Sequence, residues 1–187
     1  MVRRGADGPL VARAKDGDEV AWRELYLLHA RRLVVWLGSV PTGDAAATPE
    51  DVASETWTVA ATRIRDFHGT EDDFGGWLVG IARKVAANHR RRVQRRRTDA
   101  TDDVGDGAAP LVDSPETEVG GQDLTRRLLE QLSPREAEVI ACIDVVGLDV
   151  AATARALGMS TTAVRVARHR GLGRLRRLVD DETGTIS

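Results

Sequence analysis

The hydrophobic and polar positions of residues 74–97 predict a helix with one apolar and one cationic face. Apolar residues recur at steps of three and four, as on one stripe of an α-helix: Phe74, Trp77, Leu78, Ile81 and Val85. The opposite face carries Gly80, Arg83, Lys84, Ala87, Arg91 and Gln94. Residues 83–97 contain eight Lys or Arg and no acid, so these charges cannot be neutralised within the helix. A phosphate backbone is the natural counter-charge, and a solvated charged face is the alternative interpretation.

Two further helices are predicted upstream, over residues 10–37 and from Pro49 to about Ile64. Thr48 is suited to the N-cap of the second helix, and Glu50 and Asp51 would lie at the positive end of its dipole. The first helix is expected to bury Val20, Trp22, Leu25, Leu28, Leu33, Val34 and Leu37. The second is expected to bury Val52, Trp57, Val59 and Ala60. Residues 66–73 then form a short polar loop that holds Phe67 and His68.

The pattern changes twice after the cationic helix. Residues 98–121 show no periodicity, and residues 99–123 contain eight Asp or Glu and no Lys or Arg, which indicates a flexible acidic linker. Periodicity returns with a short helix over residues 124–132 and a further one from the capping box Ser133–Glu136 to about Gly147. No stretch alternates like a strand. The sequence therefore predicts an all-α fold of two small helical domains, residues 10–97 and 122–180, joined by the linker 98–121.

Residues 149–178 have the spacing of a helix-turn-helix. Ala154 would lie where two helices nearly touch, Gly158 in a left-handed turn, and Val164 as the buried anchor of the second helix. Ser160 is expected to cap that helix. Its inner stripe would be Val164, Ala167, Gly171, Leu175 and Leu178, and its outer face Thr162, Arg165, Val166, His169, Arg170 and Arg176. Residues 155–177 contain seven Arg and no acid, which favours entry into a major groove over a scaffold with a basic surface.

Composition limits the other possibilities. The chain of 187 residues has a net charge of −2, so its basic character is local. Cys142 is the one cysteine and lies in an apolar run, which predicts a core residue and no disulfide framework or Cys/His metal site. Neither a signal sequence nor an apolar run of bilayer length is found, so we expect a cytoplasmic protein without membrane insertion.

No catalytic constellation emerges from the polar residues. Glu50, Asp51 and Glu55 fall on about one helical turn and could hold Mg²⁺, but acids at a helix start more often offset the dipole. The histidines lie in unrelated contexts, and no Ser or Cys has an activating partner. Glycine-rich nucleotide loops are absent. We therefore expect no catalytic site, no metal site and no cofactor.

Three segments, in this order, resemble a bacterial RNA polymerase sigma factor of the extracytoplasmic-function class. PEDVASETWTVAATRI is similar to the family's core-polymerase-binding helix, and FGGWLVGIARKVAANHRRR to its promoter-melting and minus-ten segment. LSPREAEVIACIDVVGLDVAATARALGMSTTAVRVARHRGLGRLRRL is similar to its minus-thirty-five helix-turn-helix. The resemblance implies a protein without catalytic activity that directs core RNA polymerase to promoter DNA, both double-stranded and melted. It also allows for an inhibitory anti-sigma factor as a partner.

The resemblance implies three sets of contact residues by position. Core polymerase would be bound by Glu50, Asp51 and Glu55. The minus-ten region, including a flipped base at the loop 66–73, would be contacted by Phe67, His68, Arg83, Lys84, Ala87, Asn88 and Arg91. The minus-thirty-five element would be contacted by Thr162, Arg165, Val166, His169 and Arg170. Lys84 and Asn88 stand where the family often has Asn and Asp, which allows a different minus-ten preference.

Two other functions remain open from the sequence. One is a plain DNA-binding regulator that uses only the C-terminal helix-turn-helix, with the N-terminal bundle as a sensor or dimerisation module. The other is an inert protein-interaction module. A sigma factor is distinguished from both because it co-purifies with core polymerase and supports transcription.

Overall fold

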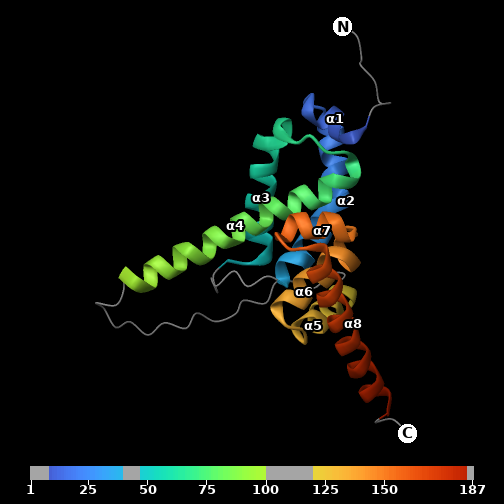
Figure 1. The fold of residues 1–187 in the computed structure, drawn as a ribbon. Coiled ribbons are helices and arrows are strands. Elements are labelled where there is room, and N and C mark those ends of the chain that lie inside the picture. The colour runs from blue at the N-terminus through green and yellow to red at the C-terminus, as the bar shows by residue number, and fades with distance from the viewer. Residues whose placement is uncertain (1–8, 40–46, 100–119, 185–187) are drawn as a thin grey trace.

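The computed structural model describes residues 9–39, 47–99 and 120–184, most of which are helical (Figure 1). In chain order the elements are α1 (Leu10–Lys15), α2 (Glu19–Gly38), α3 (Pro49–Arg63), a 3₁₀ turn η1 (Ile64–Asp66), α4 (Glu71–Asp99), α5 (Gly120–Glu130), α6 (Pro134–Ile140), a π-helical segment η3 (Ala141–Val146), α7 (Val150–Leu157) and α8 (Thr161–Gly184). These ranges contain no strand, which confirms the predicted all-α fold. Most of the predicted linker, at residues 100–119, lies outside the described residues.

The prediction of one continuous N-terminal helix is wrong, because the chain breaks between α1 and α2. Gly17 adopts the left-handed conformation with φ of +86°. The Asp18 carboxylate then caps α2 by accepting a hydrogen bond from Ala21 N at 3.2 Å. The predicted inward stripe also fails at Val20 and Leu28, which are 58% and 55% exposed. The other stripe residues are buried (Leu25, Leu33 and Leu37) or half-buried (Trp22 and Val34).

The helices α3 and α4 begin with the same kind of cap. Thr48 caps α3 as predicted, in a capping box with Asp51. An unpredicted counterpart starts α4, where the Thr70 hydroxyl donates to Asp73 Oδ2 at 2.9 Å, so the helix begins at Glu71 and not at Phe74. The predicted apolar stripe of α4 is buried at Phe74, Leu78, Ile81 and Val85, and Val79, Ala82 and Ala86 widen it. On α3, Val52 and Ala60 are buried as predicted, while Trp57 and Val59 are half-buried.

The C-terminal half contains the predicted helix-turn-helix. Gly158 ends α7 with φ of +63°, and Val164 is fully buried in α8. Ser160 Oγ accepts a hydrogen bond from Ala163 N at 3.2 Å, as expected of a cap. Gly171 lets α8 approach α6, because a Cβ there would lie 2.6 Å from Ile140 Cδ1. The spacing of small residues therefore predicted the motif correctly.

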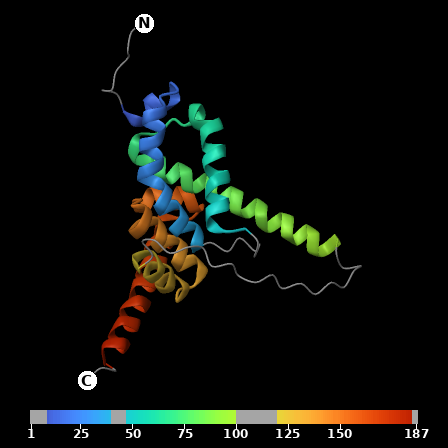
Figure 2. The ribbon, with the colours of Figure 1, turned by 180° about the vertical axis from the view of Figure 1, so that it is seen from behind.

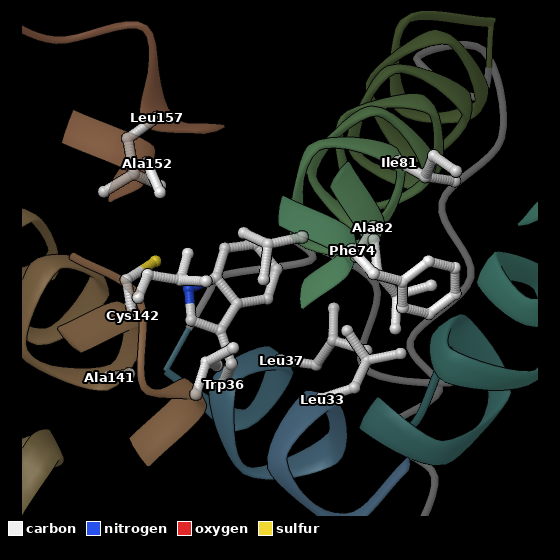
Figure 3. Packing of buried hydrophobic residues seen from close by; sticks show 14 of the residues in the cluster. Leu33, Trp36, Leu37, Phe74, Ile81, Ala82, Ala141, Cys142, Ala152 and Leu157 are labelled. Atoms are coloured by element: carbon white, nitrogen blue, oxygen red, sulfur yellow. The ribbon is translucent and has the colours of Figure 1, made fainter. Parts of the chain in front are cut away.

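The two halves of the chain pack directly against each other, with α4 beside α7 and α2 beside η3 (Figures 1 and 2). A Cβ on Gly75 would lie 3.5 Å from Leu148 Cδ2, and one on Gly76 would lie 3.8 Å from Ala152 Cβ. The Trp36 indole is fully buried and lies beside Cys142 (Figure 3). We call this contact, formed by Trp36, Gly75 and Gly76 with Cys142, Leu148 and Ala152, the interdomain seam. Burial confirms Cys142 as a core residue.

Candidate nucleic-acid interface

The cationic face of α4 lines an open hollow of about 1000 Å³. Lys84, Asn88 and Arg91 are exposed on it, and Arg83 and Ala87 are half-buried. Arg91 Nη1 donates to Asn88 Oδ1 at 3.4 Å, so these two side chains support each other. The structure therefore gathers all five α4 residues of the predicted minus-ten set along one wall. The opposite wall is supplied by the C-terminal half, through Ala152, Arg155, Ala156 and Gly158.

Charges face each other across this hollow. Arg155 Nη2 of α7 lies 3.2 Å from Asp73 Oδ1 of α4 in a partly exposed ion pair. Hydrogen bonds from Thr70 lower the pKa of Asp73, and Arg155 adds to the shift. Burial raises the pKa of Glu138 in α6, and Arg83 is the first of the cations that oppose this rise. Asp73 of one half is thus paired with Arg155 of the other, and Glu138 lies within electrostatic range of Arg83.

The two loop residues of the predicted minus-ten set separate in the structure. His68 is exposed, whereas Phe67 is only 5% exposed. The Phe67 ring centroid lies 5.1 Å from that of Trp77 and 5.8 Å from that of Phe74, and the backbone oxygen of Phe67 accepts a hydrogen bond from Lys15 Nζ. Phe67 therefore supports the aromatic floor of the hollow. Its contact with a base stays a prediction.

The outer face of α8 is fully presented to solvent. Its five predicted contact residues are all exposed: Thr162, Arg165, Val166, His169 and Arg170. Arg168 behaves differently, because its guanidinium bonds Asp144 of η3 at 2.6 and 3.2 Å, and this hydrogen bonding raises the pKa of Arg168. Arg168 thus anchors α8 to its own bundle, and the outer five remain as one continuous face.

The three acids of the predicted polymerase-binding set lie at the start of α3. Glu50 and Asp51 are exposed, and Glu55 is half-exposed. The Asp51 carboxylate accepts hydrogen bonds from the backbone N of Thr48 at 3.0 Å and from the Thr48 hydroxyl at 2.9 Å. Both bonds lower the pKa of Asp51. His89 Nε2 of α4 lies 2.8 Å from Glu55 Oε2. Sequence reasoning missed this last contact, since no local pattern joins residues of two different helices.

An exposed apolar surface that the sequence analysis did not single out lies on α2. Tyr26, Leu27 and Leu28 are 50%, 71% and 55% exposed. The Tyr26 ring centroid lies 5.1 Å from that of Trp57, which connects this apolar surface to α3. The signal was present in the sequence, because the α2 stripe is too broad for one buried face.

Other kinds of site are not supported among the described ranges. Within them, no group of three His, Cys, Asp or Glu could hold a metal ion. The same ranges include no helix that is both long and apolar enough to cross a membrane.

Comparison with known families assigns both halves of the chain. The family described as Sigma-70 region 2 matches residues 25–97, and the one described as Sigma-70, region 4 matches residues 122–175. The first covers most of α2, all of α3 and nearly all of α4, and the second covers the helix-turn-helix.

Curated relatives extend over most of the chain. It is 33% identical to the ECF RNA polymerase sigma factor BldN of Streptomyces coelicolor, over 92% of this chain and 66% of that protein. It is 30% identical to the ECF RNA polymerase sigma factor ShbA of Streptomyces griseus, over 92% of this chain and 95% of that protein. It is 32% identical to the ECF RNA polymerase sigma factor SigD of Mycobacterium tuberculosis, over 89% of this chain and 81% of that protein.

Two solved structures share the fold at 22% identity and a TM-score of 0.60. One is CnrH in complex with the cytosolic domain of CnrY, covering 92% of this chain and 96% of that chain. The other is the sigma factor RpoE from Bartonella quintana in complex with the anti-sigma factor NepR, covering 89% and 98%. At this identity they support the two-bundle helical fold.

Proposed function

The chain belongs to the extracytoplasmic-function class of sigma-70 factors, and on that premise we propose how its surfaces divide the work of promoter recognition. As a sigma factor it binds core RNA polymerase and directs promoter-specific initiation of transcription. We infer that it acts in the cytoplasm, where the polymerase transcribes, and contributes binding rather than catalysis. The domains we assign are residues 10–97 and 122–180.

We assign polymerase binding to the exposed start of α3. Glu50, Asp51 and Glu55 present acids on one side of this helix. The exposed apolar surface of α2 lies next to it through the contact between Tyr26 and Trp57, and we include that surface in the docking area. An apolar area beside a charged edge is the usual anatomy of a protein–protein interface.

We assign the minus-ten region to α4 and the loop before it, and the minus-thirty-five element to α8. One observation carries this assignment. Each of the two helices has a face whose charged residues are all cationic, and the other side of that helix is buried. Arg83, Lys84 and Arg91 would meet phosphates, and His68 would meet a melted base beside the Trp77 floor. On α8, Arg165 and Arg170 would read base edges in the major groove.

We further infer that the seam opens before both helices hold one promoter. A Cβ on Gly158 would lie 3.4 Å from Arg83 Nη1. Thr162 follows four residues later, and four residues span at most about 14 Å, so the start of α8 lies within about 20 Å of Arg83. The two promoter elements lie about 25 base pairs apart, or about 85 Å along straight duplex. The closed arrangement cannot span that length.

An anti-sigma factor is a second partner that we propose. The sigma factor from Bartonella quintana is described in complex with one. In this chain, the same closed arrangement would offer such a partner both halves at once.

Run-off transcription with purified core polymerase tests the function. We expect transcripts from a promoter bearing both elements, and none from core polymerase alone.

A double variant tests the α3 assignment: Glu50→Lys combined with Glu55→Lys should abolish capture of core polymerase. Asp51 is left intact, because its carboxylate belongs to the α3 cap and its loss would destabilise the helix by about 1 kcal/mol. DNA binding at the minus-thirty-five element without polymerase capture would instead identify a plain regulator.

A further inference from the structure

His89 and Glu55 form a contact between the helix assigned to polymerase binding and the helix assigned to the minus-ten region. His89 Nε2 lies 2.8 Å from Glu55 Oε2, between residues 34 positions apart in the sequence. The contact exists because α3 and α4 pack side by side. The His89 side chain is 16% exposed and that of Glu55 is 39% exposed. The imidazole is therefore on the inner side of the pair, and the carboxylate is on the side that a partner can reach.

The neighbouring acid Asp51 is held in place by a different contact. Its carboxylate is fixed by the backbone N–H and hydroxyl of Thr48. These hydrogen bonds lower the pKa of Asp51, and His89 adds a smaller effect in the same direction, which places the imidazole near both acids. Two of the three acids on this face are thus fixed by the chain itself in the absence of any partner.

We propose that His89 is a positioning residue for core-polymerase binding, which holds the Glu55 carboxylate in the direction required by the polymerase. The role rests on the proposed assignment of the α3 face. A glutamate on a helix surface samples several rotamers, and binding must remove that freedom. Fixing the rotamer beforehand lowers this entropic cost and so strengthens binding without adding a contact to the partner.

The test compares capture of core polymerase by full-length chains. His89→Leu removes the donor and should weaken affinity by up to about tenfold, because the polymerase must then immobilise a free Glu55 side chain. His89→Gln places an amide N–H near the position of Nε2 and should remain within about threefold of the wild type. Glu55→Ala should weaken capture, and His89→Leu added to Glu55→Ala should weaken it no further, because the two residues act as one unit.

Two controls separate positioning from a general loss of structure. Gln94→Leu changes an exposed polar residue of the same helix and should leave capture unchanged. Thermal unfolding of each variant reports the fold independently, and a structural role for His89 would make the loss of capture in His89→Leu follow a loss of stability.

The outcomes distinguish the inference from its premise. If Glu55→Ala weakens capture but His89→Leu does not, the premise stands and the positioning role is overturned. The role is also overturned if His89→Leu causes an undiminished loss in the Glu55→Ala chain. If neither Glu55→Ala nor Glu50→Lys affects capture, the α3 assignment is wrong, and the role of His89 falls with it.

Discussion

The helices α4 and α8 carry similar cationic faces, yet the fold presents them differently. The five outer residues of α8 are exposed. On α4, Arg83 is half-buried and lies close to Gly158 of the other half, whereas Lys84, Asn88 and Arg91 are exposed. Sequence pattern thus determines which side chains share a face, and the packing of distant segments determines whether that face can be reached.

The position of each helix in the fold explains the difference. α4 contacts both α3 and α7, so its first half is enclosed from two sides (Figure 1). Gly75 and Gly76 lie in the second contact, where a Cβ on either would be within ordinary van der Waals distance of Leu148. α8 packs through a narrow stripe on α6 and α7, and its far end extends away from the bundle (Figure 1). A helix in the middle of a fold is therefore the one whose binding face can be covered by other helices of the same chain.

Locking the two halves together should give the largest effect. In the double variant D73C/R155C, a short bis-maleimide linker would join the two positions that now form the ion pair across the seam. Relative to the unlinked double variant, which has already lost the Asp73 cap of α4, we expect promoter-dependent run-off transcription to fall to background on linking, because α4 and α8 can no longer separate. Binding of a minus-thirty-five duplex alone should persist, since the α8 face is exposed in the closed arrangement.

The natural cysteine should not interfere with this experiment. Burial raises the pKa of Cys142 to about 12, although the Trp36 indole beside it opposes the shift, so the thiol stays protonated and enclosed at neutral pH. A matched control places the same linker on R126C/E130C, an exposed pair within α5. Full transcription by the linked D73C/R155C chain would show that the seam need not open.

Replacing single arginines on the two helices should give a smaller and more specific effect. Arg165→Ala should relax preference within the minus-thirty-five element by about 1–3 kcal/mol, as expected for loss of a bidentate contact to guanine. Arg91→Ala should weaken binding to all sequences alike and reduce the slope of log affinity against log salt by about 1. Binding to a panel of promoter variants at several salt concentrations separates the two.

This comparison has its own internal control. Arg168 lies on α8 but is bonded to Asp144, so Arg168→Ala should change stability more than sequence preference. The division of labour fails if Arg165→Ala and Arg91→Ala cause equal losses that do not depend on sequence.

Local patterns predicted most of the individual elements. Thr48, Ser133 and Ser160 each begin a helix, and Gly158 turns between two, because each acts through neighbours within four residues. The break at Gly17 and Asp18 also has local signals, a glycine followed by a capping residue, but the broad apolar stripe over residues 10–37 favours one continuous helix.

Contacts between distant segments could not be predicted in the same way. Nothing near Glu55 indicates His89, and nothing near Phe67 indicates that its ring lies against Phe74 and Trp77. The interdomain seam is the clearest example of such a contact. From the sequence alone Gly75 and Gly76 could equally face solvent, and only the structure shows that they face Leu148 and Ala152. The candidate contact faces were therefore predictable as sets, but their accessibility was not.

The smallest expected effect concerns pH and begins at His29, on the α2 side of the seam. A Cβ on Gly75 would lie 3.4 Å from His29 Cε1 and 3.5 Å from Leu148 Cδ2, so the imidazole lies beside the contact between the halves. Its Nδ1 is buried without a hydrogen-bond partner in the described structure. Burial lowers the pKa of His29, and the nearby Arg32 lowers it further. Arg32 also donates to Val146 O across the seam at 3.5 Å, so a protonated imidazole would put a second positive charge at this contact.

The sign of the pH dependence follows from this lowered pKa. In the unfolded chain His29 titrates near its ordinary value of about 6.5, so acid protonates the unfolded chain more readily than the folded one. The contribution of neutral His29 to stability is therefore present above about pH 6.5 and is lost as pH falls towards the lower folded value. Urea unfolding at pH 7.5 and 5.5 should show a decrease for the wild type that is smaller in His29→Leu. His169→Gln, which changes an exposed imidazole on α8, should keep the wild-type decrease. An unchanged decrease in His29→Leu would place the acid sensitivity elsewhere.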